Sequence, residues 1–333
     1  MKRFALLSLL AVCLAYGVVV LGAYVRLSDA GLGCPDWPVC YGRIVPPTAA
    51  DEVAAANAAY PERPVESHKA WKEQLHRYFA SALGLLILVL AGHAWRNRRA
   101  AAQPVQLPLL LVALVIFQGL LGMWTVTLLL KPLVVMLHLL GGMATLLLLW
   151  WLHLRARQPA TVAGRGDRIA AWTAAAMVVA YVQIALGGWT SSNYAALACR
   201  DLPTCLGVFW PELSFKDAFV LWRGLGINYE YGVLEAPART AIHYSHRLGA
   251  LITLLAVGIL ALRCLARPER VLRRAGWVLL GALSLQLALG IANVLLSLSM
   301  PAAVAHNAGA ALLLLALATV LYFSRRQPRA SVQ

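Results

Sequence analysis

The sequence predicts an all-α, polytopic membrane protein with eight transmembrane helices arranged as two tandem four-helix bundles. Apolar residues make up 61% of the 333 residues and charged residues only 13%. The apolar residues gather in runs long enough to cross a bilayer, which takes about 20 residues. In addition, matching cysteine and histidine pairs recur after a shift of 165 to 170 residues. A repeat of this length indicates a duplicated multi-helix unit.

Each long apolar run defines one expected span. The spans are expected at 4–24, 77–94, 106–127, 133–152, 169–190, 241–262, 276–297 and 302–323. The first half, 1–160, and the second half, 161–333, each contain four. The first run spans about 21 residues, whereas the core of a signal peptide has ~7–15. We therefore interpret it as a helix that is retained.

The distribution of charge predicts the orientation in the membrane. The segments expected on one side hold 17 of the 29 basic residues but only two acids, Asp167 and Glu269. These segments are 1–3, 95–104, 153–168, 263–274 and 324–333. Because basic loops stay in the cytoplasm, both termini are expected there. Anionic lipid accounts for the net charge of +15, so we expect no nucleic-acid partner. Without a longer presequence, a bacterial inner membrane is expected.

Two long segments are expected on the outer side. Residues 26–75 are rich in Pro and Ala, which predicts an irregular segment with one short helix. In residues 191–240, Ser214 and Asp217 resemble a capping box at the start of an amphipathic turn. The apolar side of that turn would carry Phe215, Phe219, Trp222 and Leu225. Such a turn could lie on the outer leaflet or cover a site beneath it.

Four of the six cysteines form two equally spaced pairs within these outer segments. The pairs are Cys34 with Cys40 and Cys199 with Cys205. Disulfides persist in an oxidising compartment, so both pairs are candidates for structural disulfides. A redox-active pair is the functional alternative. A zinc site is a weaker one, because no second ligand pair lies nearby.

Four of the eight histidines are candidate ligands. His76, His138, His246 and His306 lie near the outer ends of the even-numbered spans, where a polar side chain is costly unless it faces the bundle interior. The repeat pairs His76 with His138 and His246 with His306. Two neutral imidazoles that project inward from neighbouring helices form the axial ligands of a six-coordinate haem. Another metal or a proton path would use the same residues. His68, His93 and His153 are expected to be ordinary polar residues.

The two histidine pairs differ in one neighbour. Glu73 precedes His76 by three residues and so lies on the same helical face, whereas the second half has His243 at that position. A carboxylate beside a haem can act as a base or stabilise positive charge. The alternative is an interfacial acid that pairs with Arg77 or Lys72.

Other residues near the histidines are also repeated. Arg77 and Arg247 directly follow ligand candidates and would bind haem propionates or reach lipid headgroups. The segments Gln118 to Gly122 and Gln286 to Gly290 suit close helix packing or a haem contact.

Taken together, these phrases resemble the haem A synthase family, CtaA. The phrases are Val25 to Cys40 (VRLSDAGLGCPDWPVC), Glu73 to Arg77 (EQLHR), Leu137-His138, and His243 to Arg247 (HYSHR). The resemblance covers essentially the whole chain. It implies oxidation of a ring-D methyl of haem O to a formyl group, which gives haem A for terminal oxidases. Chemistry of this kind has to be supplied by a cofactor.

The resemblance also implies different tasks for the two halves. His246 and His306 would hold a haem b cofactor. His76 and His138 would bind the substrate, haem O, with Glu73 as the catalytic carboxylate. The paired cysteines would form one outer-face disulfide in each half. Haem O synthase, which is protohaem farnesyltransferase, and an electron donor are the expected protein partners.

Two rival classes use some of the same features. A b-type electron-transfer cytochrome also needs paired histidines, but it would give Glu73 no role and leave its haems unchanged. A haem transporter would share the parallel repeat, but its binding site would be marked by broken helices at the membrane midplane. The candidate ligands lie at the outer boundary instead.

Overall fold

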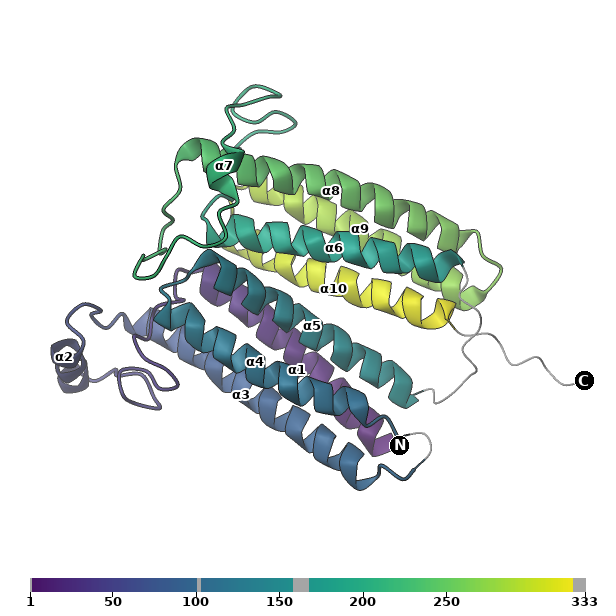
Figure 1. The fold of residues 1–333 in the computed structure, drawn as a ribbon, viewed down its shortest axis with the longest axis horizontal. Helices are drawn as coiled ribbons and strands as arrows, with labels where there is room; N and C mark the ends of the chain where they lie inside the picture. Colours follow the sequence, from purple (N-terminus) through teal and green to yellow (C-terminus); the bar gives the residue numbers. More distant parts are fainter. Residues whose placement is uncertain (1, 101–102, 158–167, 326–333) are drawn as a thin grey trace, which may run out of the picture.

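The fold consists of long helices joined by short inner and long outer connections (Figure 1). The structure is a computed structural model that describes residues 2–100, 103–157 and 168–325. Its helices are α1 (Lys2–Leu27), α2 (Ala50–Ala59), α3 (Ser67–Arg96), α4 (Gln106–Thr127), α5 (Pro132–Arg157), α6 (Arg168–Ser192), α7 (Phe215–Ala218), α8 (Ala236–Leu265), α9 (Arg270–Leu295) and α10 (Met300–Ser324). All but α2 and α7 are long and apolar enough to cross a membrane, which makes eight candidate spans in the described ranges. The predicted fold class is confirmed.

Each half forms a ring of four packed helices. In the first half, α1 and α4 both pack against α3 and α5; in the second, α6 and α9 both pack against α8 and α10. Over the described residues, the backbones of α3 and α5 lie farther apart than those of the packed neighbours, as do the backbones of α8 and α10, although their side chains meet in the bundle interior. The helices that carry the candidate histidines therefore face each other diagonally. The expectation that these histidines come from neighbouring helices was wrong, because the square arrangement places α3 opposite α5 and α8 opposite α10.

The two bundles meet through α1, α5, α6 and α10 (Figure 1). Two tyrosines connect them in matching ways. Tyr16 of α1 donates to the carbonyl of Ala308 at 3.5 Å, and Tyr181 of α6 donates to the carbonyl of Leu140 at 2.5 Å. The two tyrosines are 165 residues apart in the sequence, and the two residues that supply the carbonyls are 168 apart. This arrangement is consistent with a tandem duplication. The expected boundary at residues 160 and 161 lies outside the described residues.

Several helices extend beyond the apolar runs that predicted them. α3 begins at Ser67 and α8 at Ala236, so the outer segments are shorter than the expected 26–75 and 191–240. His76 consequently lies nine residues inside its helix, not at the start. An apolar run ends where polar residues begin, but the helix itself continues, because its backbone hydrogen bonds still form where the chain leaves the membrane. Pro237 near the start of α8 also suits a helical first turn.

The outer segments contain the two short helices. α2 confirms the short helix expected in the Pro- and Ala-rich segment. α7 is a single turn, in which the Ser214 hydroxyl donates to the Asp217 carboxylate at 2.7 Å. The longer amphipathic turn expected there does not form, since Phe219, Trp222 and Leu225 follow the helix as irregular chain.

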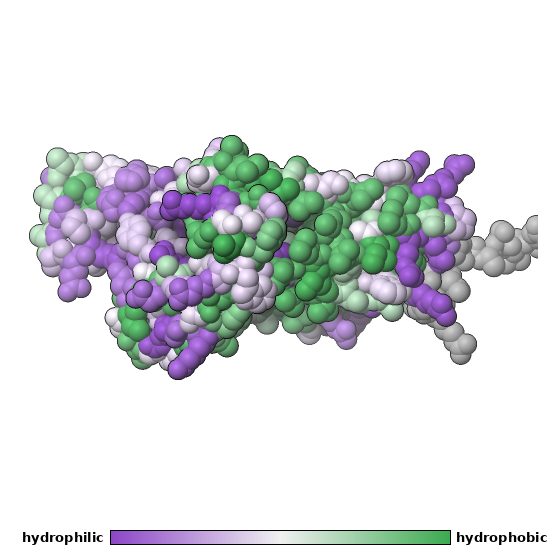
Figure 2. Space-filling view, turned by 90° about the horizontal axis from the view of Figure 1, so that it is seen from above, coloured by the Kyte–Doolittle hydropathy of each residue, from purple (hydrophilic) through white to green (hydrophobic). Residues whose placement is uncertain are grey.

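The distribution of surface polarity fits a membrane protein. Figure 2 shows a broad apolar band between two polar ends. α1 begins and α10 ends at the same end of the molecule, opposite to α2 and α7 (Figure 1). Toward that end the first bundle is solidly packed, with Ile87, Leu90, Met143 and Leu146 almost fully buried. The histidines lie in the outer part, above this packed core.

Candidate functional site

The first candidate site lies between His76 of α3 and His138 of α5. Their ring centroids are 6.5 Å apart and the rings are nearly perpendicular, at 83°. A metal–imidazole bond is about 2.0–2.1 Å long, so two imidazoles on opposite sides of one metal ion have centroids roughly 6 Å apart. The spacing of the two histidines is therefore close to that of an axial ligand pair.

A glycine on a flanking helix makes room for each of the four histidines. A Cβ atom at Gly22 of α1 would lie 3.0 Å from Cε1 of His76, and one at Gly122 of α4 would lie 3.5 Å from Cε1 of His138. The second bundle repeats this arrangement. A Cβ atom would lie 3.1 Å from Cε1 of His246 at Gly187 and 3.2 Å from Cε1 of His306 at Gly290. The histidine rings thus pack directly on helix backbone.

The polar atoms of these sites are incompletely paired. The Nδ1 atoms of His76, His138 and His306 are buried without a hydrogen-bond partner in the described part of the chain. His246 differs, since the Gln183 side-chain amide contacts its Nδ1 at 3.1 Å and donates to its carbonyl at 2.9 Å. Buried polar atoms normally have partners, so the orphaned imidazole nitrogens indicate an unmet binding role.

The donor set indicates what these sites could hold. No cluster of three or more His, Cys, Asp or Glu side chains suited to a metal ion occurs within residues 2–100, 103–157 and 168–325. A pair of imidazoles alone is a poor site for a bare ion but the right set for haem, whose porphyrin supplies the remaining ligands. Both histidine pairs therefore fit haem better than they fit zinc.

A disulfide-closed loop packs against the outer part of α3 in the first half and of α8 in the second. Cys34 and Cys40 are bonded, as are Cys199 and Cys205, which confirms the predicted pairing. Matching aspartates shape the two loops. Asp36 accepts from the amides of Tyr41 and Gly42, at 2.7 and 2.6 Å.

In the second loop, Asp201 plays the equivalent part. It accepts from the amides of Leu206 and Gly207, at 2.7 and 2.9 Å, and from the Thr204 hydroxyl. These hydrogen bonds, that of Thr204 first, lower the pKa of Asp201 below its ordinary value. Neither aspartate was identified as important from the sequence, although their shared shift of 165 residues was a usable signal.

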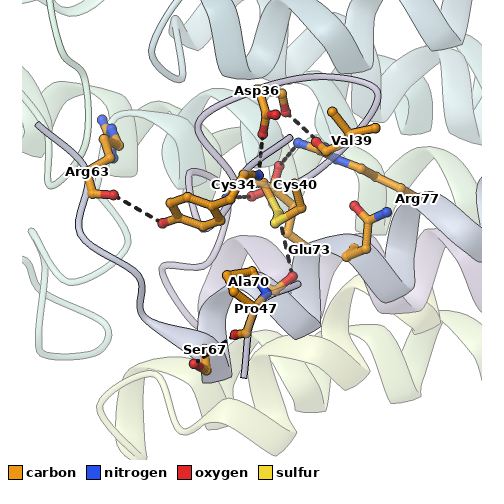
Figure 3. Close-up of a disulfide and its surroundings, with 12 residues drawn as sticks. Cys34, Asp36, Val39, Cys40, Pro47, Arg63, Ser67, Ala70, Glu73 and Arg77 are labelled. Atoms are coloured by element: carbon orange, nitrogen blue, oxygen red, sulfur yellow. Dashed lines mark hydrogen bonds and ion pairs between the residues drawn. A yellow bond between two sulfur atoms is a disulfide. The ribbon is translucent and has the colours of Figure 1, made fainter. Parts of the chain in front are cut away.

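Glu73 of α3 is hydrogen-bonded to the first disulfide loop (Figure 3). Its carboxylate is buried, with the residue only 6% exposed. One oxygen accepts from the Cys34 amide at 2.9 Å, and the other pairs with Arg77 at 2.6 Å. The ion pair with Arg77 that the sequence admitted is present. At the matching position, His243 accepts from the Cys199 amide at 3.3 Å through Nδ1.

The two repeated arginines also bind the loops. Arg77 donates to the carbonyls of Asp36 and Val39 at 3.0 and 2.6 Å (Figure 3). Arg247 donates to the carbonyls of Thr204 and Cys199 at 2.8 and 2.9 Å. Each of them thus holds a disulfide loop against its helix, and the propionate or headgroup contacts that the sequence suggests stay predictions.

The remaining histidines lie away from both pairs. His153 is buried near the opposite end, within 3.1 Å of the Ser8 hydroxyl and the Ala5 carbonyl. His93 is hydrogen-bonded to Asn97 at 2.9 Å, and His68 is exposed. These contacts suit the ordinary polar roles expected for them.

Comparison with known proteins gives a consistent result. Residues 5–318 match the family COX15-CtaA, described as "Cytochrome oxidase assembly protein". The chain is 47% identical to "Heme A synthase" of Shewanella oneidensis over 308 residues, which cover 92% of each protein. It is 26% identical to "Heme A synthase" of Caulobacter vibrioides, over 98% of this chain and 97% of that protein. For "Heme A synthase" of Paracoccus denitrificans the identity is 29%, over 94% and 84% respectively. With two bundles, paired histidines and a family match over nearly its full length, this multi-pass membrane protein belongs to the COX15-CtaA family of cytochrome oxidase assembly proteins.

Proposed function

We propose that the chain is a haem A synthase, an oxidoreductase that converts a ring-D methyl of haem O into a formyl group. The observation that carries this proposal is the pair of diagonal His–His sites, one with a buried carboxylate and one without. Relatives named "Heme A synthase" that align over nearly the whole chain support it.

We assign the second bundle to a resident haem b, held by His246 and His306. When bound, this group would supply one-electron chemistry through its iron. The chain contributes the ligands, the glycine-lined space beside each imidazole and the Gln183 amide next to His246. Such contacts around a ligand histidine fix its orientation and tune the metal.

We assign the first bundle to the substrate, with His76 and His138 as ligands of haem O. Glu73 lies three residues before His76 and is the only carboxylate among the residues assigned to the two sites. Positive charge that builds up as the methyl group is oxidised would be stabilised by a nearby anion. Its pairing with Arg77 and the Cys34 amide holds the carboxylate in one place, so that it is positioned before substrate binds.

The proposed setting is a bacterial inner membrane with both termini in the cytoplasm. The basic segments at the end where α1 begins support this orientation, as do the disulfides at the opposite end. Haem O carries a long apolar tail, so haem O synthase in the same membrane is the proposed supplier. Converting a methyl into a formyl group removes four electrons and adds one oxygen atom, so an oxidant is required; with dioxygen as that oxidant, an electron donor is required as well.

The test is to express the chain with a source of haem O in a host that lacks haem A, and then to extract and weigh the haems. We expect haem A alongside haem b. Recovery of haem b alone, with haem O unchanged, would identify an electron-transfer cytochrome instead. Haem O bound and released without oxidation would identify a transporter.

A further inference from the structure

The second outer segment reaches across to the first bundle. Residues 222–231, here called the strap, belong to the second half of the sequence. In Figure 1 they are part of the green loop that hangs from α7 and α8 toward the first bundle. The amide of Tyr229 donates to the carbonyl of Leu129 at 3.0 Å, in the turn between α4 and α5. Tyr229 itself is 2% exposed.

An apolar cluster and an ion pair hold the strap in place. Ile227 and Tyr229 pack with Leu32, Val126 and Leu130 of the first half. At the end of the strap, Glu230 pairs with Arg63 of the first outer segment at 3.2 Å, and both side chains are largely shielded from solvent. These contacts all join the second half of the sequence to the first.

Lys131 lies at the centre of this contact. It directly precedes α5 and is 2% exposed, which is unusual for a lysine. Its ammonium donates to the carbonyl of Gly224 and lies 3.4 Å from the centre of the Trp222 ring. A cation over an aromatic face is attracted by the ring, so Lys131 holds the strap by two interactions. His138 follows Lys131 by seven residues, two helical turns, and so lies below it on the same side of α5.

The second bundle has the same turn, and among the described residues no backbone hydrogen bond from an outer segment to that turn is found. Leu129 and Leu130 adopt left-handed backbone angles, with φ of 51° and 60°, and so do Ser297 and Leu298 between α9 and α10, with φ of 48° and 60°. Leu130 is 6% exposed and its counterpart Leu298 is half-buried, while Leu128 is half-buried and its counterpart Leu296 is 58% exposed. The residue that matches Lys131 under the 168-residue shift is Ser299, which carries no charge.

We propose that Lys131 is a positioning residue that fastens the strap over the outer end of the first bundle and so shields the His76–His138 site from the outer aqueous phase. The strap contacts described above are all made to the first half, so the strap covers the outer end of the first bundle. Excluding water strengthens electrostatic interactions within a site and suppresses side reactions of an oxidation. That the shielded site is the substrate site rests on the proposed function, whereas the shielding itself does not.

The experiment measures whether water-soluble reagents reach the space beneath the strap. Val126 lies under the strap and is 4% exposed, and Val294 is its counterpart in the second bundle, 9% exposed. Val126→Cys and Val294→Cys are made separately in the full-length protein, whose two free cysteines are removed by Cys13→Ser and Cys264→Ser. Each is reconstituted in lipid and labelled with a membrane-impermeant maleimide, with and without Lys131→Met.

We expect Lys131→Met to speed labelling of the thiol from Val126→Cys about tenfold or more. Loss of a hydrogen bond to a charged group shifts the equilibrium between the closed and the open strap by at least about tenfold. Labelling of the thiol from Val294→Cys should not change, and Lys131→Arg should keep labelling slow. Equal acceleration of both thiols would show general loosening and overturn the proposal, as would no acceleration at either. Because labelling reports access to a thiol and not haem chemistry, failure of the proposed function would leave this result intact.

Discussion

At the scale of single residues, Glu73 and His243 occupy matching places but differ in charge. Both accept a hydrogen bond from the amide of the first cysteine in the adjacent disulfide loop. Glu73 therefore has a structural task besides the catalytic role that we propose. A change to alanine would remove both, so a substitution that separates them is needed.

Glu73→Gln separates the two tasks, because a glutamine oxygen can still accept from the Cys34 amide but carries no charge. If the charge is needed, haem A formation should fall about 10²–10⁴-fold, while haem b in the second bundle stays. The measurement is the ratio of haem A to haem O extracted from cells. His243→Gln is the matched control and should leave that ratio unchanged. A normal ratio for Glu73→Gln together with a low one for Glu73→Ala would show that Glu73 only anchors the loop.

At the scale of helices, the glycines opposite the histidines explain how α1, α4, α6 and α9 approach the ligand rings. Two of them, Gly122 and Gly290, fall in phrases that the sequence marked as repeated. Gly22 and Gly187 also match under the 165-residue shift, but nothing in the chain itself shows that a histidine lies opposite. Their role depends on which helix faces which, and that emerges only when the bundle is assembled.

Gly187→Ala tests this helix contact in the second bundle. The added Cβ would lie 3.1 Å from Cε1 of His246, so the ring must shift, at a cost of about 1–3 kcal/mol for overpacking. We expect a lower content of low-spin haem b or an altered optical spectrum. Gly281→Ala is the control, since a Cβ there meets nothing within 4 Å. It should keep the spectrum and be neutral or stabilising by about 0.5–1 kcal/mol. Identical spectra for both variants would count against the assigned ligand role of His246.

At the scale of the whole molecule, the sequence predicts the parts that follow from hydropathy and from the repeat. All eight spans lie where apolar runs occur, and His76 faces His138 as the repeat suggests. The diagonal placement of the ligand helices was not predictable, because periodicity does not say which helices are adjacent. Lys131 was missed for a similar reason: its partners Trp222 and Gly224 lie more than 90 positions away.

The two bundles should also be separable in function, because each has its own histidine pair and flanking glycines. His246→Ala removes one proposed ligand of the second site and should abolish the low-spin haem b spectrum of the purified protein. His76→Ala should leave that spectrum in place and abolish haem A formation, since it alters only the first site. Both variants should still insert in the membrane, which is checked by their yield in the membrane fraction. Loss of haem b in His76→Ala at normal yield would contradict the division of tasks. It would show either that the resident haem lies in the first bundle or that the two sites fill together through the interface of α1, α5, α6 and α10.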